Sequence, residues 1–415
     1  MTAPTRHDAY AALRHGDFRW YVVSVMLMTI ATQIRGVVVG WQLYALTHDP
    51  LVLGLIGLAE ALPFISAALF AGHVADTADR RAIVLGAMVA LLACAGSLLA
   101  LVLSHPAEAG DVRWFYLIIG VSGVARSFLT AARTALVAEL VPRSQYANAS
   151  AWRASTWQFA AVVGPALGGL LYGFGGPRIA YATDVSLMVL AVLTITLVRP
   201  RGRPAGRPTE GVVESLGAGI RFVLAQPLLL GALSLDLFAV LFGGAVALLP
   251  VFAADILHVG PQGLGLLRAA PAVGAVGMSL WVAHRPPMQR AGRALFLSVT
   301  LFGASMIAFG LSRNFWLSGA LLAFGGAVDM VSVVIRSTIL QEWTPPELMG
   351  RVAAVNAVFI GSSNEVGAFE SGTAARLLGT VPSVIFGGAM TIFVVVATGW
   401  RVPELRKLRE LRNTA

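Results

Sequence analysis

The sequence is poor in charged residues, which make up 12% of its 415 positions, whereas hydrophobic residues make up 57%. Soluble domains carry about 25% charged residues, and so few charges cannot cover a water-facing surface. The apolar residues occur in long runs, such as Ile83–Ser104, Ile179–Val198 and Ser383–Trp400. A helix of about 20 apolar residues crosses the hydrocarbon core of a bilayer. The composition therefore excludes an ordinary soluble protein and indicates a membrane protein with many spans.

Lysine and cysteine are nearly absent. The single lysine, Lys407, follows the last apolar run and excludes a phosphate-binding P-loop, because that loop needs a lysine directly after its glycines. The single cysteine, Cys94, lies within an apolar run and excludes a disulfide framework. The seven histidines are scattered without the spacing of helical metal ligands. We therefore expect no cofactor, no metal, no catalytic residue and no enzymatic activity.

Twelve apolar segments can be counted along the chain. They cover residues 20–46, 51–75, 81–104, 113–140, 145–173, 178–198, 226–254, 261–284, 291–311, 314–341, 349–378 and 381–400. The runs are continuous rather than alternating, which excludes a membrane β-barrel. We predict an all-α membrane protein with twelve transmembrane helices in two pseudo-symmetric six-helix bundles.

A polar stretch separates the sixth segment from the seventh. Residues Arg199–Pro208 are rich in proline, glycine and arginine, which is typical of a flexible linker. The moderately amphipathic stretch Val212–Leu224 that follows is a candidate helix on the membrane surface. The predicted domains are an N-terminal bundle (1–198), a cytoplasmic linker with this surface helix (199–225), a C-terminal bundle (226–400) and a cytoplasmic tail (401–415).

The basic residues outside the apolar segments lie mainly on one side of the predicted membrane. The side of both termini holds 20 lysines and arginines, and the opposite side holds three. By the positive-inside rule, both termini are predicted to be cytoplasmic. The same bias explains the net charge of +9 without nucleic acid as a partner. No cleavable signal pattern precedes the first segment, so we expect the first helix to act as an uncleaved signal.

The two halves of the chain repeat one another. In the second and eighth segments, Gly57, Glu60 and Pro63 recur as Gly265, Arg268 and Pro271, at an offset of 208 residues. In the fourth and tenth segments and just beyond them, Gly123, Arg133, Glu139 and Pro142 recur as Gly326, Arg336, Glu342 and Pro345, at an offset of 203. Duplication of a six-helix half is typical of transporters in which two bundles rock about a site near the bilayer midplane.

The loop after the second segment reads Gly72-His-Val-Ala-Asp76-Thr-Ala-Asp79-Arg80-Arg81. It resembles the loop motif of the major facilitator superfamily, although Thr77 and Asp79 replace a cation and a glycine of that motif. The resemblance implies a network of charges at the cytoplasmic ends of the helices that latches the two bundles when the cavity opens outward. The residues assigned to this network are Gly72, Asp76, Arg80, Arg81, Arg133, Glu139, Arg336 and Glu342.

The fifth segment contains Gly164-Pro165-Ala-Leu-Gly168-Gly169, which resembles the antiporter motif of exporters in this superfamily. Close helix packing through small residues is the structural alternative. Residues Ala135–Pro142, with Trp41–Tyr44 and Asn364–Gly367, are similar to the branch that contains the enterobactin exporter and macrolide efflux proteins. The resemblance covers the chain end to end, and it implies a multi-pass transporter of a bacterial-type cytoplasmic (inner) membrane.

Thirteen charged residues lie inside the predicted spans. A charge at the bilayer centre costs about 2.5–3.5 kcal/mol on insertion scales, so these groups are expected to pair or to line a wet cavity. Asp184 is expected to have a local structural role. An enclosed carboxyl can exchange a proton near neutral pH, and the proton-coupling candidates are Asp236, Glu365, Asp329 and Glu60.

The repeat also suggests a charge pair. Arg126 corresponds to Asp329 at the offset of 203, which predicts an Arg126–Asp329 pair across the central cavity. Such a pair is either a proton-linked switch or a static structural ion pair. Arg268 takes the position of Glu60 in the second half and is a third candidate for a cavity ion pair.

These features predict a secondary active transporter that works by alternating access. We expect a proton-coupled exporter of a bulky, partly hydrophobic small molecule of siderophore or drug type. Two alternatives stay open, namely an importer or lysophospholipid-moving member of the same superfamily and a non-transporting membrane sensor. The expected partners are the small-molecule substrate, protons as coupling ion and membrane lipids; we expect a monomer and no nucleic acid.

Overall fold

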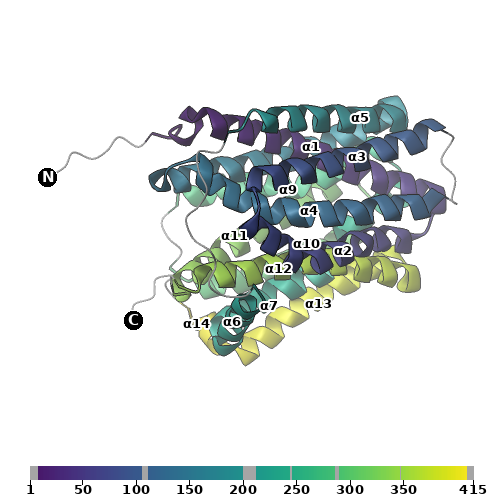
Figure 1. The fold of residues 1–415 in the computed structure, drawn as a ribbon. Helices are drawn as coiled ribbons and strands as arrows, with labels where there is room; N and C mark the ends of the chain where they lie inside the picture. Colours follow the sequence, from purple (N-terminus) through teal and green to yellow (C-terminus); the bar gives the residue numbers. More distant parts are fainter. Residues whose placement is uncertain are drawn as a thin grey trace.

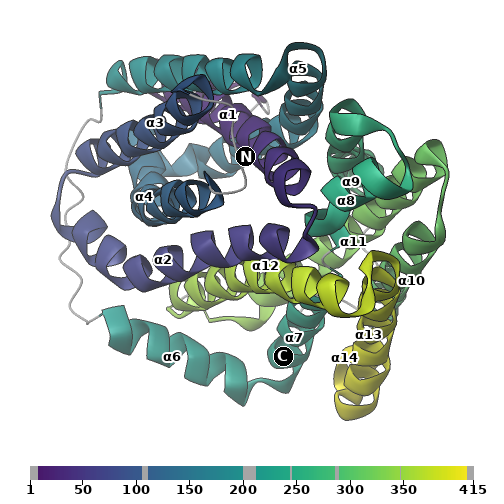
Figure 2. The same cartoon turned by 90° about the vertical axis from the view of Figure 1, so that its right-hand side faces the viewer.

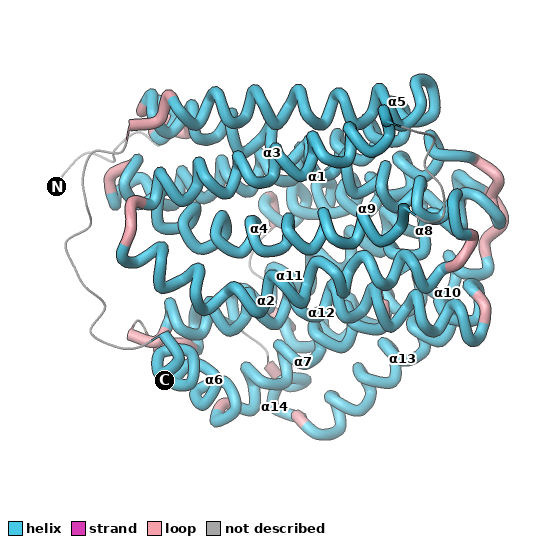
Figure 3. The backbone as a smooth tube through the Cα atoms, turned by 45° about the vertical axis from the view of Figure 1, so that its right-hand side comes forward, coloured by secondary structure: helices cyan, strands magenta, loops and turns pink. Residues whose placement is uncertain are grey.

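The computed structural model describes residues 8–104, 111–199, 212–243, 245–285, 289–345 and 347–408. Within these ranges the chain is helical, with short connections and no strand, as Figures 1 and 3 show. The first and last described residues lie at the same end of the molecule, at the left of Figure 1. We call this end of the molecule the terminal end and the opposite end the distal end.

The first half of the chain forms six spans from five α-helices, which two short 3-10 helices accompany. The elements are η1 (Ala12–Arg14), α1 (Gly16–Thr47), α2 (Pro50–Thr77), α3 (Arg80–Ser104), α4 (Val112–Leu140), η3 (Arg143–Gln145) and α5 (Tyr146–Thr196). Within α5, Gly176 adopts φ 70° and is followed by Pro177, so the helix breaks there. Glycine adopts positive φ without steric cost, and proline is favoured in the first turn of a new helix. The predicted fifth and sixth spans are therefore the two parts of α5.

The second half begins with a short helix and contains one broken span. The elements are α6 (Val212–Ala225), α7 (Pro227–Phe242), η4 (Ala245–Leu248), α8 (Leu249–Val251), η5 (Phe252–Ile256), α9 (Gly260–Ala283), α10 (Ala291–Leu311), α11 (Phe315–Trp343), α12 (Met349–Leu378), α13 (Thr380–Arg401) and α14 (Pro403–Lys407). The seventh span is not the continuous helix that the apolar run predicts. It continues after α7 as a 3-10 turn and then a π turn, and Pro250 in this stretch lacks a backbone donor.

Within the described ranges, ten helical stretches are long and apolar enough to cross a membrane. One of them, Arg143–Thr196, holds the two spans that meet at Gly176. α12 has 30 residues but is less apolar, because it carries Arg351, Glu365, Glu370 and Arg376. With these two corrections, the described residues contain the twelve predicted spans. The prediction of two six-helix bundles is confirmed.

The bundles meet through α2 beside α12 and through α5 beside α9 (Figure 2). Each bundle has its own apolar core, and a further cluster joins Val37, Tyr44 and Leu53 of the first half to Leu248 and Phe252 of the second. This shared cluster lies toward the distal end, because it involves the end of α1 and the start of α2. The bundles are therefore held together at the distal end.

Candidate functional site

Glycines allow the two bundles to approach closely at the distal end. A methyl group added at Gly372 of α12 would lie 2.8 Å from the Cα of Gly54 on α2, and one at Gly169 of α5 would lie 2.7 Å from the Cα of Gly265 on α9. Contacts this short leave no room for a side chain. The closest approaches of α2 to α12 and of α5 to α9 thus occur backbone to backbone, as small residues permit in membrane helices.

The antiporter-like motif of α5 takes part in this packing on two sides. Gly168 faces α1, where an added methyl would lie 3.0 Å from the Cα of Ile34, and Gly164 also packs on α1, against Gln33. Gly169 and the carbonyl of Pro165 face Gly265 of α9. The motif therefore joins the first bundle internally and also contacts the second bundle.

Two polar contacts reinforce the distal end. Arg376 of α12 forms an ion pair with Asp49, the N-cap of α2, at 3.3 Å, and the Tyr44 hydroxyl of α1 donates a hydrogen bond to Asp255 in η5. Together with the glycine contacts, these groups form what we call the distal seal. Sequence reasoning gave no role to Asp49 and Asp255, because neither lies in a motif and their partners are more than 200 residues away.

Four charged residues meet between the bundles near the middle of their helices. Arg126 of α4 forms an ion pair with Glu60 of α2. Glu365 of α12 lines the same small cavity of about 50 Å³ as these two residues. Arg268 of α9 donates to the Gly36 carbonyl at 3.1 Å and interacts electrostatically with Glu365 and Glu60. We call Glu60, Arg126, Arg268 and Glu365 the central cluster.

The expected Arg126–Asp329 pair is not formed. Arg126 pairs with Glu60 instead, because α2 packs directly against α4, whereas α11 belongs to the other bundle. Asp329 lies 3.9 Å from a terminal nitrogen of Arg336, which follows it by seven residues, about two turns, on the same helix. Correspondence in the repeat placed the two residues on equivalent helices but did not make them neighbours.

Two charged side chains of the spans keep a large accessible fraction. The side chain of Asp329 is 47% accessible and that of Arg126 is 42% accessible. Arg126 lines one cavity with Glu60 of its own bundle and Glu365 of the other, so the accessible space beside it lies between the bundles, and we call this space the hollow.

Two other carboxylates are locked in buried ion pairs. Asp184 of α5 accepts two hydrogen bonds from Arg35 of α1, at 2.8 and 3.0 Å, and this pair joins helices of one bundle. Asp236 of α7 pairs with Arg336 of α11, and both residues are buried. Asp184 therefore has the local surroundings that we expected. Asp236 differs from the other three proton-coupling candidates, because it is buried and they are partly exposed.

The residues assigned to the terminal network come together only in part. Arg80 pairs with Glu139 at 2.8 Å, and Arg81 donates to the carbonyl of Thr196 at 2.6 Å. These contacts join helices of the first bundle to one another. A methyl group added at Gly72 would meet no atom within 4 Å, so no other helix packs closely there. Glu342 is exposed, and Arg336 forms its ion pair with Asp236. The side chain of Asp76 lies outside the described part of the structure.

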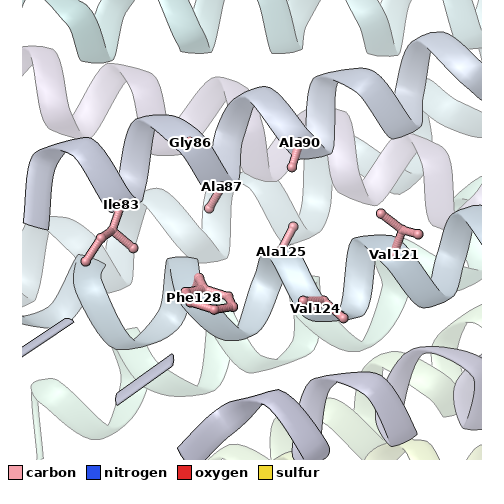
Figure 4. Close-up of a pocket in the computed structure, with 8 residues that line it drawn as sticks. All are labelled: Ile83, Gly86, Ala87, Ala90, Val121, Val124, Ala125 and Phe128. Atoms are coloured by element: carbon pink, nitrogen blue, oxygen red, sulfur yellow. The ribbon is translucent and has the colours of Figure 1, made fainter. Parts of the chain in front are cut away.

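A larger pocket of about 540 Å³ lies between α3 and α4 (Figure 4). Its lining is apolar throughout, with Ile83, Val121, Val124 and Phe128 as the larger side chains. This pocket therefore offers no side chain that can bind a proton or an ion. Among the described residues, no group of three or more histidine, cysteine or acidic side chains could hold a metal ion.

Comparison with known proteins agrees with this architecture. The sequence pattern of the family described as transmembrane secretion effector, within the major facilitator superfamily, matches residues 7–414. The chain belongs to this family of the major facilitator superfamily. It is a multi-pass membrane transporter and not an enzyme.

Curated relatives and solved structures extend over nearly the whole chain. The enterobactin exporter EntS of Shigella flexneri is 26% identical over 397 residues, which cover 95% of this chain and 94% of that protein. The bacterial homologue of the human lysosomal transporter Spinster, inward-facing and occupied, has a TM-score of 0.72 at 14% identity, covering 97% of this chain and 99% of that one. The inward-open xylose transporter XylE of E. coli has a TM-score of 0.68 at 12% identity, covering 92% and 95%.

Proposed function

We propose that this transporter exports a bulky, partly hydrophobic small molecule of siderophore type in exchange for protons. The observation that carries the proposal is the central cluster, in which ionisable groups of both bundles meet beside an internal hollow. The similarity to enterobactin exporters over 95% of the chain supports the direction and the substrate type.

The similarity to enterobactin exporters supports a bacterial-type inner membrane, and the bias of basic residues supports a cytoplasmic position for both termini. On this orientation the terminal end is cytoplasmic and the distal seal is periplasmic. The structure then corresponds to an inward-facing state, because the bundles are joined by the distal seal, while the Arg80–Glu139 pair at the other end stays within one bundle. Substrate would enter the hollow from the cytoplasm.

Among the carboxyls, Glu365 is the best candidate for the exchanged proton. Asp236 and Glu60 are paired with Arg336 and Arg126, whereas no arginine nitrogen of the described residues lies within 4.0 Å of the Glu365 carboxylate. Glu365 belongs to the second bundle but lines the cavity with Glu60 and Arg126 of the first. A proton on Glu365 changes the charge balance between the bundles, since Glu60, Arg126 and Arg268 all act on it.

The test uses the full chain in proteoliposomes, with enterobactin as the probe. With the cytoplasmic side outward, an acidic lumen is expected to drive enterobactin into the vesicles. Glu365→Gln is expected to abolish the response to the pH gradient but to keep gradient-independent exchange of enterobactin. Glu370→Gln is the matched control, because this carboxyl of the same helix lies toward the distal end and contacts only Ser371 among the described hydrogen bonds.

Transport that ignores the pH gradient would overturn proton coupling. Net movement in the opposite direction under the same gradient would show an importer. A Glu365→Gln variant that responds to the gradient as the unsubstituted protein does would remove Glu365 from the coupling step and direct attention to Asp329.

A further inference from the structure

A group of donors without acceptors lies on the first bundle, between the central cluster and the terminal end. It consists of Tyr21 near the start of α1, Arg133 in the second half of α4 and Arg153 near the start of α5. The charges of Arg133 and Arg153 act on the Tyr21 hydroxyl, and the charge of Arg153 acts on Arg133. We call these three residues the basic cluster.

The polar atoms of this cluster have no partner in the described protein. The Tyr21 hydroxyl and the Nε of Arg133 are both buried and make no hydrogen bond, and Tyr21 is 0% exposed. No carboxylate of the described residues lies within 4.0 Å of Arg133 or Arg153. A buried donor without an acceptor costs free energy, and two neighbouring arginines repel each other.

The other arginines inside the spans have protein partners. Arg35, Arg126, Arg336 and Arg376 each face a carboxylate within ion-pair distance, and Arg268 donates to the carbonyl of Gly36. Arg126 lies seven residues before Arg133 on α4, and its charge also acts on Arg133 and adds to the positive potential. The basic cluster therefore has the donors and the charge of an anion site, but the described protein supplies no anion.

We propose that the basic cluster binds an anionic oxygen group of the transported molecule, such as a carboxylate. The inference rests on the proposed transport function and names the charge class of its substrate. Two guanidinium groups offer planar pairs of N–H donors that match an oxyanion, and the tyrosine hydroxyl adds a third donor direction. Along α4, Arg133 lies seven residues closer to the terminal end than Arg126 of the central cluster.

An alternative use of the same residues is a latch. When the terminal end closes, Arg133 could meet an acid of the second bundle such as Asp329, whose side chain is 47% accessible in this state. We favour the anion site because the charges of Arg133 and Arg153 both act on the Tyr21 hydroxyl within one bundle, whereas a latch needs only one of these residues. The latch is an outcome of the experiment below.

The experiment measures binding of two fluorescent probes of equal bulk to the full chain in lipid nanodiscs. The probes are pyrenebutyric acid, which is an anion at neutral pH, and its uncharged primary amide. Loss of hydrogen bonds to charged groups is worth on the order of tenfold or more in affinity. The acid is therefore expected to bind at least about tenfold more tightly than the amide.

Four variants then test which residues produce the preference for the acid over the amide. We expect Arg133→Gln and Arg153→Gln each to lower the affinity for the acid to that for the amide and to leave the affinity for the amide unchanged. Arg133→Lys is expected to keep part of the preference for the acid. Tyr21→Phe removes only the hydroxyl and is expected to weaken the acid alone, by a smaller factor. Arg143→Gln, at an exposed arginine of the same end, is the matched control and is expected to keep the full preference.

Equal affinity of the unsubstituted protein for acid and amide would overturn the proposal. So would equal weakening of both probes in Arg133→Gln and Arg153→Gln, since that result indicates a structural role. An acid preference that survives both variants, together with a shifted balance between inward and outward states, would identify the latch. Because binding is measured without transport, an acid preference that depends on the cluster would stand even if export or proton coupling failed.

Discussion

The distal seal makes a specific prediction about Gly265. A methyl group added there would lie 2.6 Å from the Pro165 carbonyl oxygen and 2.9 Å from the Cα of Gly169. Ordinary contacts of a methyl group are about 3.5–4 Å, and both neighbours are backbone atoms of α5, so the two helices must move apart. Overpacking of this kind costs about 1–3 kcal/mol. The cost applies only to the state in which the seal is closed.

Gly265→Ala is therefore expected to shift the balance toward the state with an open distal end by roughly five- to 150-fold. Spin labels on cysteines that replace Trp114 and Trp316 report this balance, because these residues lie at the distal starts of α4 and α11 and are 46% and 78% exposed. The labels are placed in a Cys94→Ala background. Double electron–electron resonance should show a longer label distance in Gly265→Ala.

Gly277→Ala is the matched control on the same helix, because an added methyl there meets no atom within 4 Å. Both variants gain the same helix propensity, so only the clash differs between them. An unchanged distance distribution in Gly265→Ala, or an equal shift in Gly277→Ala, would refute the reasoning about the seal.

Three further variants test the ion pairs. Asp184→Asn leaves the buried Arg35 without its charged partner and is expected to destabilise the protein by about 3–5 kcal/mol, which thermal unfolding in detergent measures; an unchanged midpoint would contradict a buried pair. Asp49→Asn keeps a side chain that can cap α2 but removes the charge of the partly exposed pair with Arg376, worth about 0–1 kcal/mol, and should slightly favour the open distal end. Arg376→Gln removes the other charge and should lengthen the label distance to the same extent, and an unchanged distance in both variants would show that the pair does not contribute.

Much of the fold could be predicted from the sequence. The lengths of the apolar runs fix the spans, because the bilayer sets a minimum length for each helix. The break between the fifth and sixth spans was also visible, since Gly176-Pro177 interrupts the run. The break in the seventh span was not visible in the sequence, because residues 226–254 stay apolar through the 3-10 turn and the π turn.

The charge pairs could be predicted less well. The sequence identifies which spans carry Asp329, Arg126 and Glu60, but the nearest partner depends on which helices pack together. Asp236 pairs with Arg336 and Asp49 with Arg376, across 100 and 327 residues of chain. The glycines of the antiporter-like motif indicated close packing, yet only the structure identifies α9 as the neighbour of Gly169.

The central claim is that ionisable groups inside the spans face a water-accessible hollow between the bundles. Gly361→Cys tests it directly, because Gly361 lines the cavity of the central cluster and an added methyl meets no atom within 4 Å. In a Cys94→Ala background, a charged thiol reagent added at the terminal side should label this cysteine. Val124→Cys, in the apolar pocket between α3 and α4, should stay unlabelled. An unreactive Gly361→Cys, or equal labelling at both positions, would contradict the hollow and with it the account of transport.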